Sequence, residues 1–559
     1  MLVVMSIEQE VSQHLRAGRA GDAERILRGR LELAPQDAGL RAMLAQVLAA
    51  TGRKDEAIAE LSTAVEQAPG GRGTRLLLAR LANERGRNAL AEQHARILTA
   101  ANPADSEAWS ALGFAASRLG KPRAALEALR RAVSLAPNYA AARYNLAAVL
   151  CEQERSEEAL VETGEAMRVG ARHRGAAVVR ARALVQLDRH DEAERLLLQL
   201  LAENPADDQG HVLLVRLRRL RGDADPLRDL RGAAGAMATP AMRLAYADAL
   251  RRSGEHAAAV ETLQRLIAEL GRAPLLLASM ATVLQESGQM DAAFGLSAEA
   301  LAGAGDDAGI AETFAVSAIA TRHLAEALPV VEAFRAARPR DQRWITHRID
   351  IARLRGEQAF DDWFDPARVI RTFELPAPTD ALRCVLDARH HGQHPLDQSL
   401  RNGTQTSRNL LVCPEPELVS LFESFEAALV QYQGEIGQNA EHPLLSRNVA
   451  PAALMGCWSV RLRAGGHHVN HIHPEGWVSS AYYVSVPDEV ADENARAGWL
   501  KFGEPRFPVE GLGSFEFVRP LPGRLVLFPS YLWHGTTPLR GDSPRMSVAF
   551  DAVPRTEMQ

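Results

Sequence analysis

A spacing of 34 residues recurs through the first 340 or so residues and constrains the fold more than any other feature. Glycines stand at this spacing at Gly18, Gly52, Gly86 and Gly120, the series resumes at Gly222, and a further pair, Gly254 and Gly288, is again 34 apart. Five residues after the glycine position there is an alanine: Ala23, Ala57, Ala91, Ala125, Ala159, Ala193, Ala259, Ala293 and Ala327. Prolines keep the same phase twelve residues later: Pro35, Pro69, Pro103, Pro137, Pro205 and Pro339. Three series in one phase indicate a repeated structural unit.

Each mark has a physical role in a pair of helices. A glycine accepts the positive φ that ends the first helix and turns the chain back. An alanine early in the second helix allows two helices to approach closely, and a proline after that helix prevents it from continuing. Apolar residues recur at helical spacing between the marks, as in Leu44, Val47 and Leu48. The pattern therefore predicts stacked antiparallel helix pairs.

This segment resembles tetratricopeptide repeats, whose period is about 34 residues. The resemblance covers roughly residues 7–344, about ten units, and residues 345–363 are expected to form a closing helix. The unit at 211–244 departs from the pattern, because Leu227 replaces the alanine and Pro226 interrupts the second helix. A kink or irregular packing is expected there. Such arrays form a concave groove, so a docked peptide or protein is expected, the alternative being a groove filled by the chain itself or a second copy.

The helical pattern ends near Asp365 and Pro366, and segments with strand character follow. Residues 369–375, 454–463, 477–487, 499–504, 515–520, 524–530 and 547–553 are predicted strands, with an amphipathic helix at 415–436. Strand after strand with little helix between them predicts a closed or double-sheet antiparallel fold. The fold class is therefore an α + β multidomain chain, with a helical solenoid at 1–363 and a β-rich domain at 364–559.

Histidines form the densest chemical feature of the β-rich part. His471 and His473 are two residues apart, so on an extended chain both rings project from one face and can reach one metal ion. His534 follows a second apolar strand. Arg545 and Ser547 are also two residues apart and share one face of a third strand.

These segments, HIHPEGWVSSAYYVSVP, GRLVLFPSYLWHGTTP and PRMSVAFD, resemble 2-oxoglutarate- and iron(II)-dependent oxygenases that are fused behind tetratricopeptide repeats. The resemblance spans about residues 390–554 and implies a double-stranded β-helix, or jelly roll. It implies Fe(II) bound by His471, His473 and His534. It also implies that Arg545 forms a salt bridge to the distal carboxylate of 2-oxoglutarate, assisted by Ser547, since a guanidinium binds a carboxylate bidentately.

One position departs from that family pattern, because His473 stands where Asp or Glu is usual. His473 is the preferred third ligand, while Glu475 or a water molecule are the alternatives. Asn470 and Glu475 are expected beside the ligands, where Asn470 orients one of them by a hydrogen bond. Tyr482 and Tyr483 point to opposite faces of a strand, and Tyr483 is expected to face the cavity and the cosubstrate.

The resemblance implies a dioxygenase of the hydroxylase type. O₂ oxidises 2-oxoglutarate to succinate and CO₂, and a substrate C–H becomes C–OH. The substrate is expected to be a peptide or protein recruited by the repeats, a hypothesis from domain pairing. The alternatives are a cupin-like metal enzyme that does not use 2-oxoglutarate, and a scaffold protein whose oxygenase-like domain is inactive. Glycosyl transfer is disfavoured, because no doubly wound pattern follows the repeats.

Composition excludes some partners and compartments. The formal net charge is −6, so neither nucleic acid nor an anionic membrane is expected as a partner. Cys151, Cys384, Cys413 and Cys457 are scattered and form no CxxC pair, which fits a reducing compartment. Neither a signal peptide nor a run of about 18 apolar residues is present, so a cytoplasmic location is expected.

Overall fold

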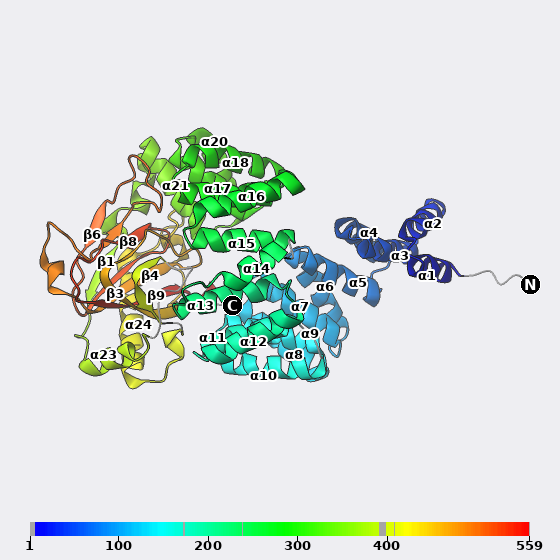
Figure 1. Ribbon diagram of the computed structural model, residues 1–559, viewed down its shortest axis with the longest axis horizontal. Coiled ribbons are helices and arrows are strands. Elements are labelled where there is room, and N and C mark those ends of the chain that lie inside the picture. Colours follow the sequence, from blue (N-terminus) through cyan, green and yellow to red (C-terminus); the bar gives the residue numbers. More distant parts are fainter. Residues whose placement is uncertain (1–5, 171–173, 237–238, 391–398, 407, 558–559) are drawn as a thin grey trace, which may run out of the picture. The chain divides into compact units, whose positions relative to one another are not determined.

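The computed structural model describes residues 6–170, 174–236, 239–390, 399–406 and 408–557. Its contacts divide the chain into two compact units, residues 1–187 and residues 188–558. The first unit contains only helices. The second unit contains further helices and all the described strands (Figure 1).

The helices follow one another in pairs joined by short turns. In the first unit they are α1 (Ile7–Arg16), α2 (Ala20–Leu33), α3 (Ala38–Ala50), α4 (Lys54–Gln67), α5 (Arg72–Glu84), α6 (Asn88–Ala101), α7 (Ser106–Arg118), α8 (Pro122–Leu135), α9 (Ala140–Glu152), α10 (Ser156–Val169) and α11 (Arg174–Gln186). In the second unit they are α12 (His190–Glu203), α13 (Asp208–Leu220), α14 (Arg228–Ala236), α15 (Pro240–Arg252), α16 (His256–Leu270), α17 (Pro274–Glu286), α18 (Met290–Gly303), α19 (Ala308–Ala320), α20 (Leu324–Ala337) and α21 (Gln342–Arg355).

The three repeat marks have the predicted structural roles. All seven glycines of the series have positive φ, between 69° and 83°. All nine alanines are fully buried, at 0% exposure. Pro35, Pro69, Pro103 and Pro137 each follow the end of a second helix by two residues. The predicted helical repeat array is therefore confirmed.

Residues other than glycine occupy the same turn at Glu154, Asp188 and Arg322, with φ of 54°, 56° and 67°. The packing of the neighbouring helices therefore imposes the left-handed conformation where the sequence no longer favours it, at a cost of about 1–2 kcal/mol per residue.

The unit predicted to be irregular differs from its neighbours in the length of its second helix. α14 has 9 residues, compared with 14 in α12 and 15 in α16. Leu227, which replaces the alanine, lies before the helix and is 2% exposed. Leu227 is thus buried in the turn before α14 and not within a helix. The closing helix expected at 345–363 is divided: α21 ends at Arg355, capped by Gly356 (φ 66°), and a separate 3-10 segment follows at Gln358–Trp363.

The C-terminal part of the second unit contains two antiparallel sheets. The strands are β1 (Arg371–Glu374), β2 (Leu400–Gln405), β3 (Ala452–His468), β4 (Val478–Ser485), β5 (Leu500–Phe502), β6 (Glu516–Val518), β7 (Arg524–Pro529), β8 (His534–Thr536) and β9 (Arg545–Pro554). The six-stranded sheet has the order β1-β7-β4-β9-β3-β2, and the three-stranded sheet has the order β6-β5-β8. This is the double-sheet arrangement that the sequence predicts, consistent with a jelly roll. Three further helices are α22 (Pro366–Val369), α23 (Asp380–Asp387) and α24 (Pro416–Ile436).

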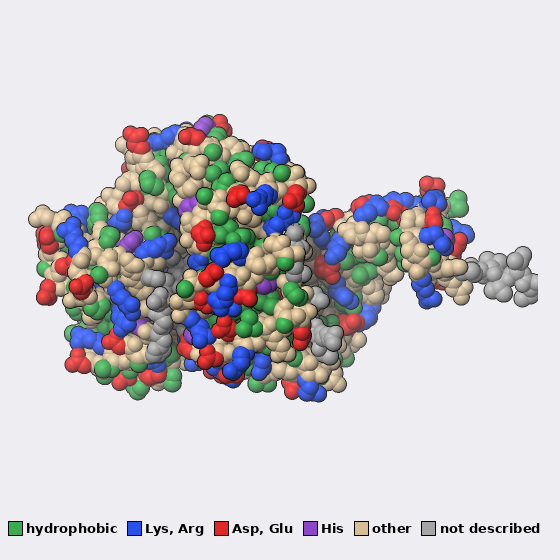
Figure 2. Space-filling view, in the orientation of Figure 1, with side chains coloured by type: hydrophobic (Ala, Val, Ile, Leu, Met, Phe, Trp, Pro, Cys, Tyr) green, Lys and Arg blue, Asp and Glu red, His purple; other side chains and the backbone are tan. Residues whose placement is uncertain are grey.

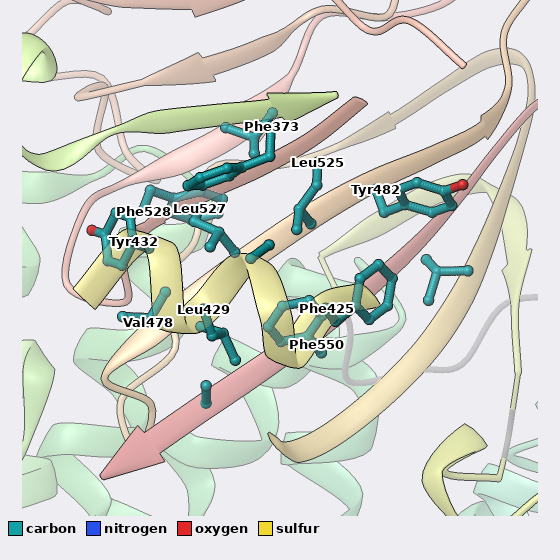
Figure 3. Packing of buried hydrophobic residues seen from close by; sticks show 14 of the residues in the cluster. Phe373, Phe425, Leu429, Tyr432, Val478, Tyr482, Leu525, Leu527, Phe528 and Phe550 are labelled. Carbon is teal, nitrogen blue, oxygen red and sulfur yellow. The ribbon is translucent and has the colours of Figure 1, made fainter. Parts of the chain in front are cut away.

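One face of the six-stranded sheet is covered by α24, the predicted amphipathic helix. Phe425 of α24 lies with its ring centroid 4.7 Å from that of Phe550 and 5.4 Å from that of Tyr482 (Figure 3). Leu429 and Tyr432 continue the same buried stripe. The opposite face of the sheet is therefore left for the smaller sheet and for the residues described below.

Replacing Phe425 by alanine should destabilise the second unit by about 3–5 kcal/mol, because a fully buried aromatic side chain is lost and a cavity remains. Val430→Ala, on the same helix at 67% exposure, is the matched control and should change stability by no more than about 0.5 kcal/mol. Chemical denaturation of both variants measures the difference. Equal midpoints would contradict the assigned core.

The helices of the second unit pack directly onto its β-rich part. Ile345 and Ile349 of α21 belong to the same hydrophobic core as the sheet. The Thr346 hydroxyl donates a hydrogen bond of 2.6 Å to the Tyr531 carbonyl, and the Gln342 amide donates one of 3.0 Å to the Pro474 carbonyl. The domain boundary between residues 363 and 364 stays a prediction, since α21 shares a core with the strands that follow it.

Charge is distributed without a strong local excess on the face that Figure 2 presents, where acidic and basic side chains alternate. Many of them form ion pairs between successive repeats, such as Arg72 with Asp105 and Arg251 with Glu286. Within the described residues, none of the helices combines the length and the apolar character that crossing a membrane requires.

Candidate metal centre

The backbone brings the two histidine segments together. His471 lies in the connection after β3, and His534 begins β8. The two residues form an isolated antiparallel bridge, with N–H to carbonyl distances of 2.9 Å and 3.0 Å. The His473 amide donates a hydrogen bond of 3.1 Å to the Ser530 carbonyl in the turn before β8. Main-chain bonds therefore fix the positions from which all three side chains project.

Three imidazoles converge at this point. One ring nitrogen from each of His471, His473 and His534 lies within 4.8 Å of the other two, close enough to share one metal ion. Ring centroids are 4.2 Å apart for His471 and His534, 5.2 Å for His471 and His473, and 5.1 Å for His473 and His534. Two of the three nitrogens come from the predicted i, i+2 pair, and the third comes from the predicted distal segment.

The Nδ1 atoms of all three rings are already engaged. Nδ1 of His471 lies 2.9 Å from the Val469 carbonyl, and Nδ1 of His534 lies 2.9 Å from the Leu532 carbonyl. Carbonyl oxygens can only accept, so each of these Nδ1 atoms carries the proton. The Nε2 lone pairs are consequently the ones that can face a metal ion, and that of His471 lies 3.3 Å from the Ser399 hydroxyl.

A carboxylate stands behind the third imidazole. Nδ1 of His473 lies 2.7 Å and 2.6 Å from the two carboxylate oxygens of Asp551 in β9. The hydroxyl of Ser479 in β4 donates a hydrogen bond of 2.7 Å to the same carboxylate, and lies 2.8 Å from the Ser530 hydroxyl. A carboxylate that accepts a hydrogen bond from a metal-ligating histidine fixes its tautomer and raises its basicity. Sequence reasoning missed Asp551.

Burial lowers the pKa of two of these rings and so favours their neutral form. Burial, and then the neighbouring His473, lower the pKa of His471 to about 3. The same causes, burial first and then His471, hold the pKa of His534 well below its usual range. Neutral imidazoles bind a divalent cation without first losing a proton.

Arg545 and Tyr483 provide unsatisfied donors on the same sheet face. Ser547 pairs with Tyr483 across β4 and β9, and Arg545 lies two residues before Ser547, so all three share a face. Arg545 is 2% exposed, and one of its amines donates a hydrogen bond to the Gly498 carbonyl. Its Nε and the Tyr483 hydroxyl have no partner among the described residues, nor does any described carboxylate pair with Arg545. A buried guanidinium without a counter-ion is costly unless an anion binds to it.

His468 links the guanidinium to the histidine cluster. Its ring lies 5.8 Å from that of His471, and its Nδ1 lies 2.8 Å from the Ser399 hydroxyl. Burial, then His471, then the charge of Arg545 lower the pKa of His468 well below its usual range. One imidazole is therefore within electrostatic reach of both the cluster and the arginine.

The remaining predicted residues lie at the edge of the cluster. Glu475 is exposed to solvent, and the described group of converging ligand atoms consists of the three histidines. The side-chain amide of Asn470 donates a hydrogen bond of 3.1 Å to the Pro505 carbonyl. Asn470 therefore connects the segment that contains His471 to the loop that contains Pro505. The roles predicted for Asn470 and Glu475 stay predictions. Trp458 stacks on His473 with ring centroids 5.7 Å apart, and Phe528 lies 4.7 Å from the His534 ring, so aromatic rings enclose the cluster.

The residues present fit the groups that the sequence resemblance implies. Neutral imidazole nitrogens suit Fe(II) as ligands. The unpaired, buried guanidinium of Arg545 suits a carboxylate, and the neighbouring hydroxyls of Tyr483 and Ser547 can donate to the same anion. The Asp551 carboxylate supplies a negative charge close to the metal position although it is not among the converging ligand atoms.

Replacing Asp551 by asparagine should weaken metal binding by about 10- to 100-fold, because the His473 ring loses its charged acceptor. Competition with a metal-binding dye measures the affinity. Asp488→Asn, at an exposed residue of a 3-10 segment, is the matched control and should leave the affinity unchanged. An Asp551→Asn variant that binds metal like the unaltered protein would show that the carboxylate serves only packing.

Two cavities reach the histidine cluster from the helical side of the second unit. The larger, of about 1350 Å³, is bounded by the turns at Gly222, Gly254 and Gly288 and by residues 399–402 and 469–472. The smaller, of about 370 Å³, is bounded by α17, α19, α21 and residues 505–507, and it also reaches His471. The helical repeats and His471 therefore line the same spaces.

Known families match both parts of the chain. Residues 456–551 match the family model described as "Putative 2OG-Fe(II) oxygenase". Residues 14–74 and 106–139 match two tetratricopeptide-repeat models. The chain thus carries tetratricopeptide repeats in its N-terminal region and a domain of that oxygenase family in its C-terminal region, as the sequence resemblance predicts.

Several solved structures of low sequence identity are similar to parts of the chain. Yeast Tom70 is 14% identical, with 65% of this chain and 90% of that chain covered and a TM-score of 0.41. Cut9–Hcn1 of the APC/C is 16% identical, with 54% and 59% covered and a TM-score of 0.32. A thermophilic tetratricopeptide-repeat protein from Thermus thermophilus is 22% identical, with 33% and 97% covered and a TM-score of 0.29. A comparison with curated proteins gives no match.

Proposed function

We propose that this protein is a 2-oxoglutarate- and Fe(II)-dependent dioxygenase that hydroxylates a substrate held between its repeats and its β-rich domain. The observation that carries the proposal is the combination of three converging imidazoles with a buried arginine that lacks a counter-ion. A zinc-type structural site would explain the first feature, but it would leave the unpaired guanidinium unexplained.

The residues of the chain have distinct tasks in this proposal. His471, His473 and His534 hold the metal through Nε2, and the Asp551 carboxylate keeps the His473 ring in the required tautomer. Arg545 binds the distal carboxylate of 2-oxoglutarate, and Tyr483 and Ser547 donate hydrogen bonds beside it. Trp458 and Phe528 exclude water from the cluster.

Fe(II) with 2-oxoglutarate supplies the oxidation of a substrate C–H bond by O₂, with succinate and CO₂ as the other products. The three histidines leave further coordination positions on the ion for the cosubstrate and O₂. The neutral imidazoles make the site more positive than one that contains a carboxylate ligand, which favours binding of the dianionic cosubstrate.

The substrate is proposed to enter through the larger cavity, where repeat turns face the metal-binding loop. A polypeptide suits this space, because tetratricopeptide arrays present extended concave surfaces. The repeats would then select the polypeptide, and the β-rich domain would oxidise the residue that reaches His471.

Two measurements on one preparation test the function. The protein is reconstituted with Fe(II) under anaerobic conditions, and bound metal is counted. Oxygen and 2-oxoglutarate are then added, and succinate is measured. One iron per chain with succinate release is the expected result. Stoichiometric iron without succinate would favour the cupin-like alternative, and protein that binds neither would favour the scaffold.

A further inference from the structure

The smaller cavity contains a buried acidic group that the proposed chemistry does not use. Asp350 of α21 is 3% exposed and lies in the cavity wall. Its Oδ2 accepts a hydrogen bond of 2.9 Å from the indole of Trp533, the neighbour of His534. Its Oδ1 has no partner among the described residues. One oxygen of this carboxyl group therefore lacks the hydrogen bond that a buried acceptor normally has.

The other charges around the cavity are already paired. Glu312 binds Arg343 at 2.6 Å, and Glu286 binds Arg506 at 3.1 Å and Arg251 at 2.6 Å. Arg353, one turn after Asp350, donates instead to the carbonyls of Gly503 and Gly513. Asp350 consequently has no ion pair among the described residues, and a cation is the missing partner.

His347 provides a second unsatisfied polar atom at the same end of the cavity. It lies three residues before Asp350, so both side chains are on one face of α21. It is 3% exposed, and its Nε2 has no partner among the described residues. Burial, and then the charge of Arg343, lower the pKa of His347 to about 4, so this ring is neutral and can accept a hydrogen bond.

The cavity wall also has an apolar side that leads to the loop with His471. Val316 and Ile319 of α19, Phe507, and Ile472 beside His471 line it. The volume of about 370 Å³ is in the range of small-ligand pockets. An apolar passage that ends in a carboxyl group matches a side chain with an aliphatic stem and a cationic head.

We infer that this cavity is a substrate subsite that receives an alkylammonium or guanidinium group, such as the side chain of lysine or arginine, with Asp350 as its acceptor. His347 accepts a second hydrogen bond from the same head, and the stem passes between Val316 and Ile472 towards His471. The choice of the oxidised residue rests on the proposed function. The binding of the cation does not.

Two further observations agree with this inference. Burial raises the pKa of Asp350 to about 7, although the Trp533 hydrogen bond and Arg353 oppose that shift, and a bound cation would stabilise the ionised form. The larger cavity has the opposite balance, with Arg219, Arg251, Arg252, Arg401 and Arg506 against Asp223 and Glu286 in its lining. Basic side chains therefore outnumber acidic ones in the lining of the larger cavity, so the unpaired carboxyl group of Asp350 is a feature of the smaller one.

Calorimetric titration of the full chain, without metal or 2-oxoglutarate, tests the subsite. The cationic probes are N-acetyl-L-argininamide and N-acetyl-L-lysinamide, and the neutral probes of similar shape are N-acetyl-L-citrullinamide and N-acetyl-L-norleucinamide. The cationic probes are expected to bind about 10- to 100-fold more tightly than the neutral ones, the effect of a hydrogen bond to a buried charge. Asp350→Asn should abolish that preference, while Asp380→Asn, at a side chain that is 93% exposed, should retain it.

A second variant keeps the test valid if Asp350→Asn alters the fold. Val316→Phe leaves Asp350 in place and fills the passage, so it should weaken all four probes together. Free L-arginine forms a further arm. If N-acetyl-L-argininamide binds more tightly than free L-arginine, the natural ligand is a residue within a polypeptide. If free L-arginine binds more tightly, the natural ligand is a small molecule. Either result agrees with a subsite for a cationic group.

Three results would overturn the inference: equal binding of cationic and neutral probes, a preference that survives Asp350→Asn, or binding of no probe at all. Because the titration needs neither iron nor cosubstrate, a failed oxygenase assay leaves its outcome intact. A failed titration likewise leaves the iron and succinate measurements intact, so the two proposals fail separately.

Discussion

Replacing His534 by alanine is expected to remove iron binding and with it all succinate formation. This histidine comes from a different segment than His471 and His473. Its loss leaves only the two histidines of one loop, which bind an ion from one side. The loss of affinity should exceed the effect of about 10- to 100-fold that removing an outer hydrogen-bond partner produces. Metal content after anaerobic reconstitution and gel filtration measures it.

The matched control for this variant is His467→Ala, four residues before His471. Its Nδ1 lies 3.0 Å from the Gly465 carbonyl, and it is not one of the three converging histidines. It should retain one iron per chain. Full iron content in the His534→Ala variant would show that the metal lies elsewhere in the protein.

Replacing Arg545 by alanine is expected to weaken 2-oxoglutarate binding by about 10- to 150-fold while the iron content stays unchanged, because a hydrogen bond to a charged group contributes about 1.5–3 kcal/mol. The buried guanidinium donates to Gly498 and has no described counter-ion, so the cosubstrate carboxylate is the anion it lacks. The affinity is measured by titrating 2-oxoglutarate into the anaerobic iron protein.

One further variant separates the charge of Arg545 from its geometry, and another is a matched control. Arg545→Lys keeps the positive charge but loses the planar fork, so its affinity should lie between those of alanine and arginine. Arg463→Ala removes an exposed arginine from the neighbouring strand β3 and should have no effect. Unchanged 2-oxoglutarate affinity in Arg545→Ala would remove the cosubstrate from the account, while the metal site would remain.

Sequence predicted the repeats well because each mark acts locally. A glycine at a positive φ, an alanine at a close helix contact and a proline after a helix are requirements of one unit, repeated in phase. The long strands were also predictable, since β3, β4, β7 and β9 have alternating or continuous apolar residues. β2 and β8 were not predicted. β8 is only three residues long and is defined by its pairing with β5, which no local pattern shows.

The site was predictable where its residues share a strand or a short loop. His471 with His473 and Arg545 with Ser547 follow the period of two, and the same period continues from Ser547 to Asp551 on β9. Asp551 is an acidic residue on the same face of β9 as Arg545 and Ser547, in a strand that is otherwise mostly apolar. This feature of the sequence could have indicated that Asp551 belongs to the site. Its partner His473 is 78 residues away, so only the fold brings the two together.

The two cavities could not be predicted from the sequence. Asp350 is part of a closing helix whose burial depends on its packing against residues 150 or more positions later. Helical periodicity places Asp350 and His347 on one face, but it does not reveal that this face contacts the metal-binding loop. Long-range packing therefore determines what the substrate meets beside the metal.

The most direct test of the central claim is the visible charge-transfer band that forms when 2-oxoglutarate chelates Fe(II) through its keto-acid group. Under anaerobic conditions, the unaltered protein should show the weak band only when both iron and 2-oxoglutarate are present, saturating at one equivalent of each. Arg545→Ala should require more 2-oxoglutarate for the same band, and His534→Ala should show none. A band of equal strength and midpoint in all three proteins, or its absence from the unaltered protein at full iron content, would contradict the shared site.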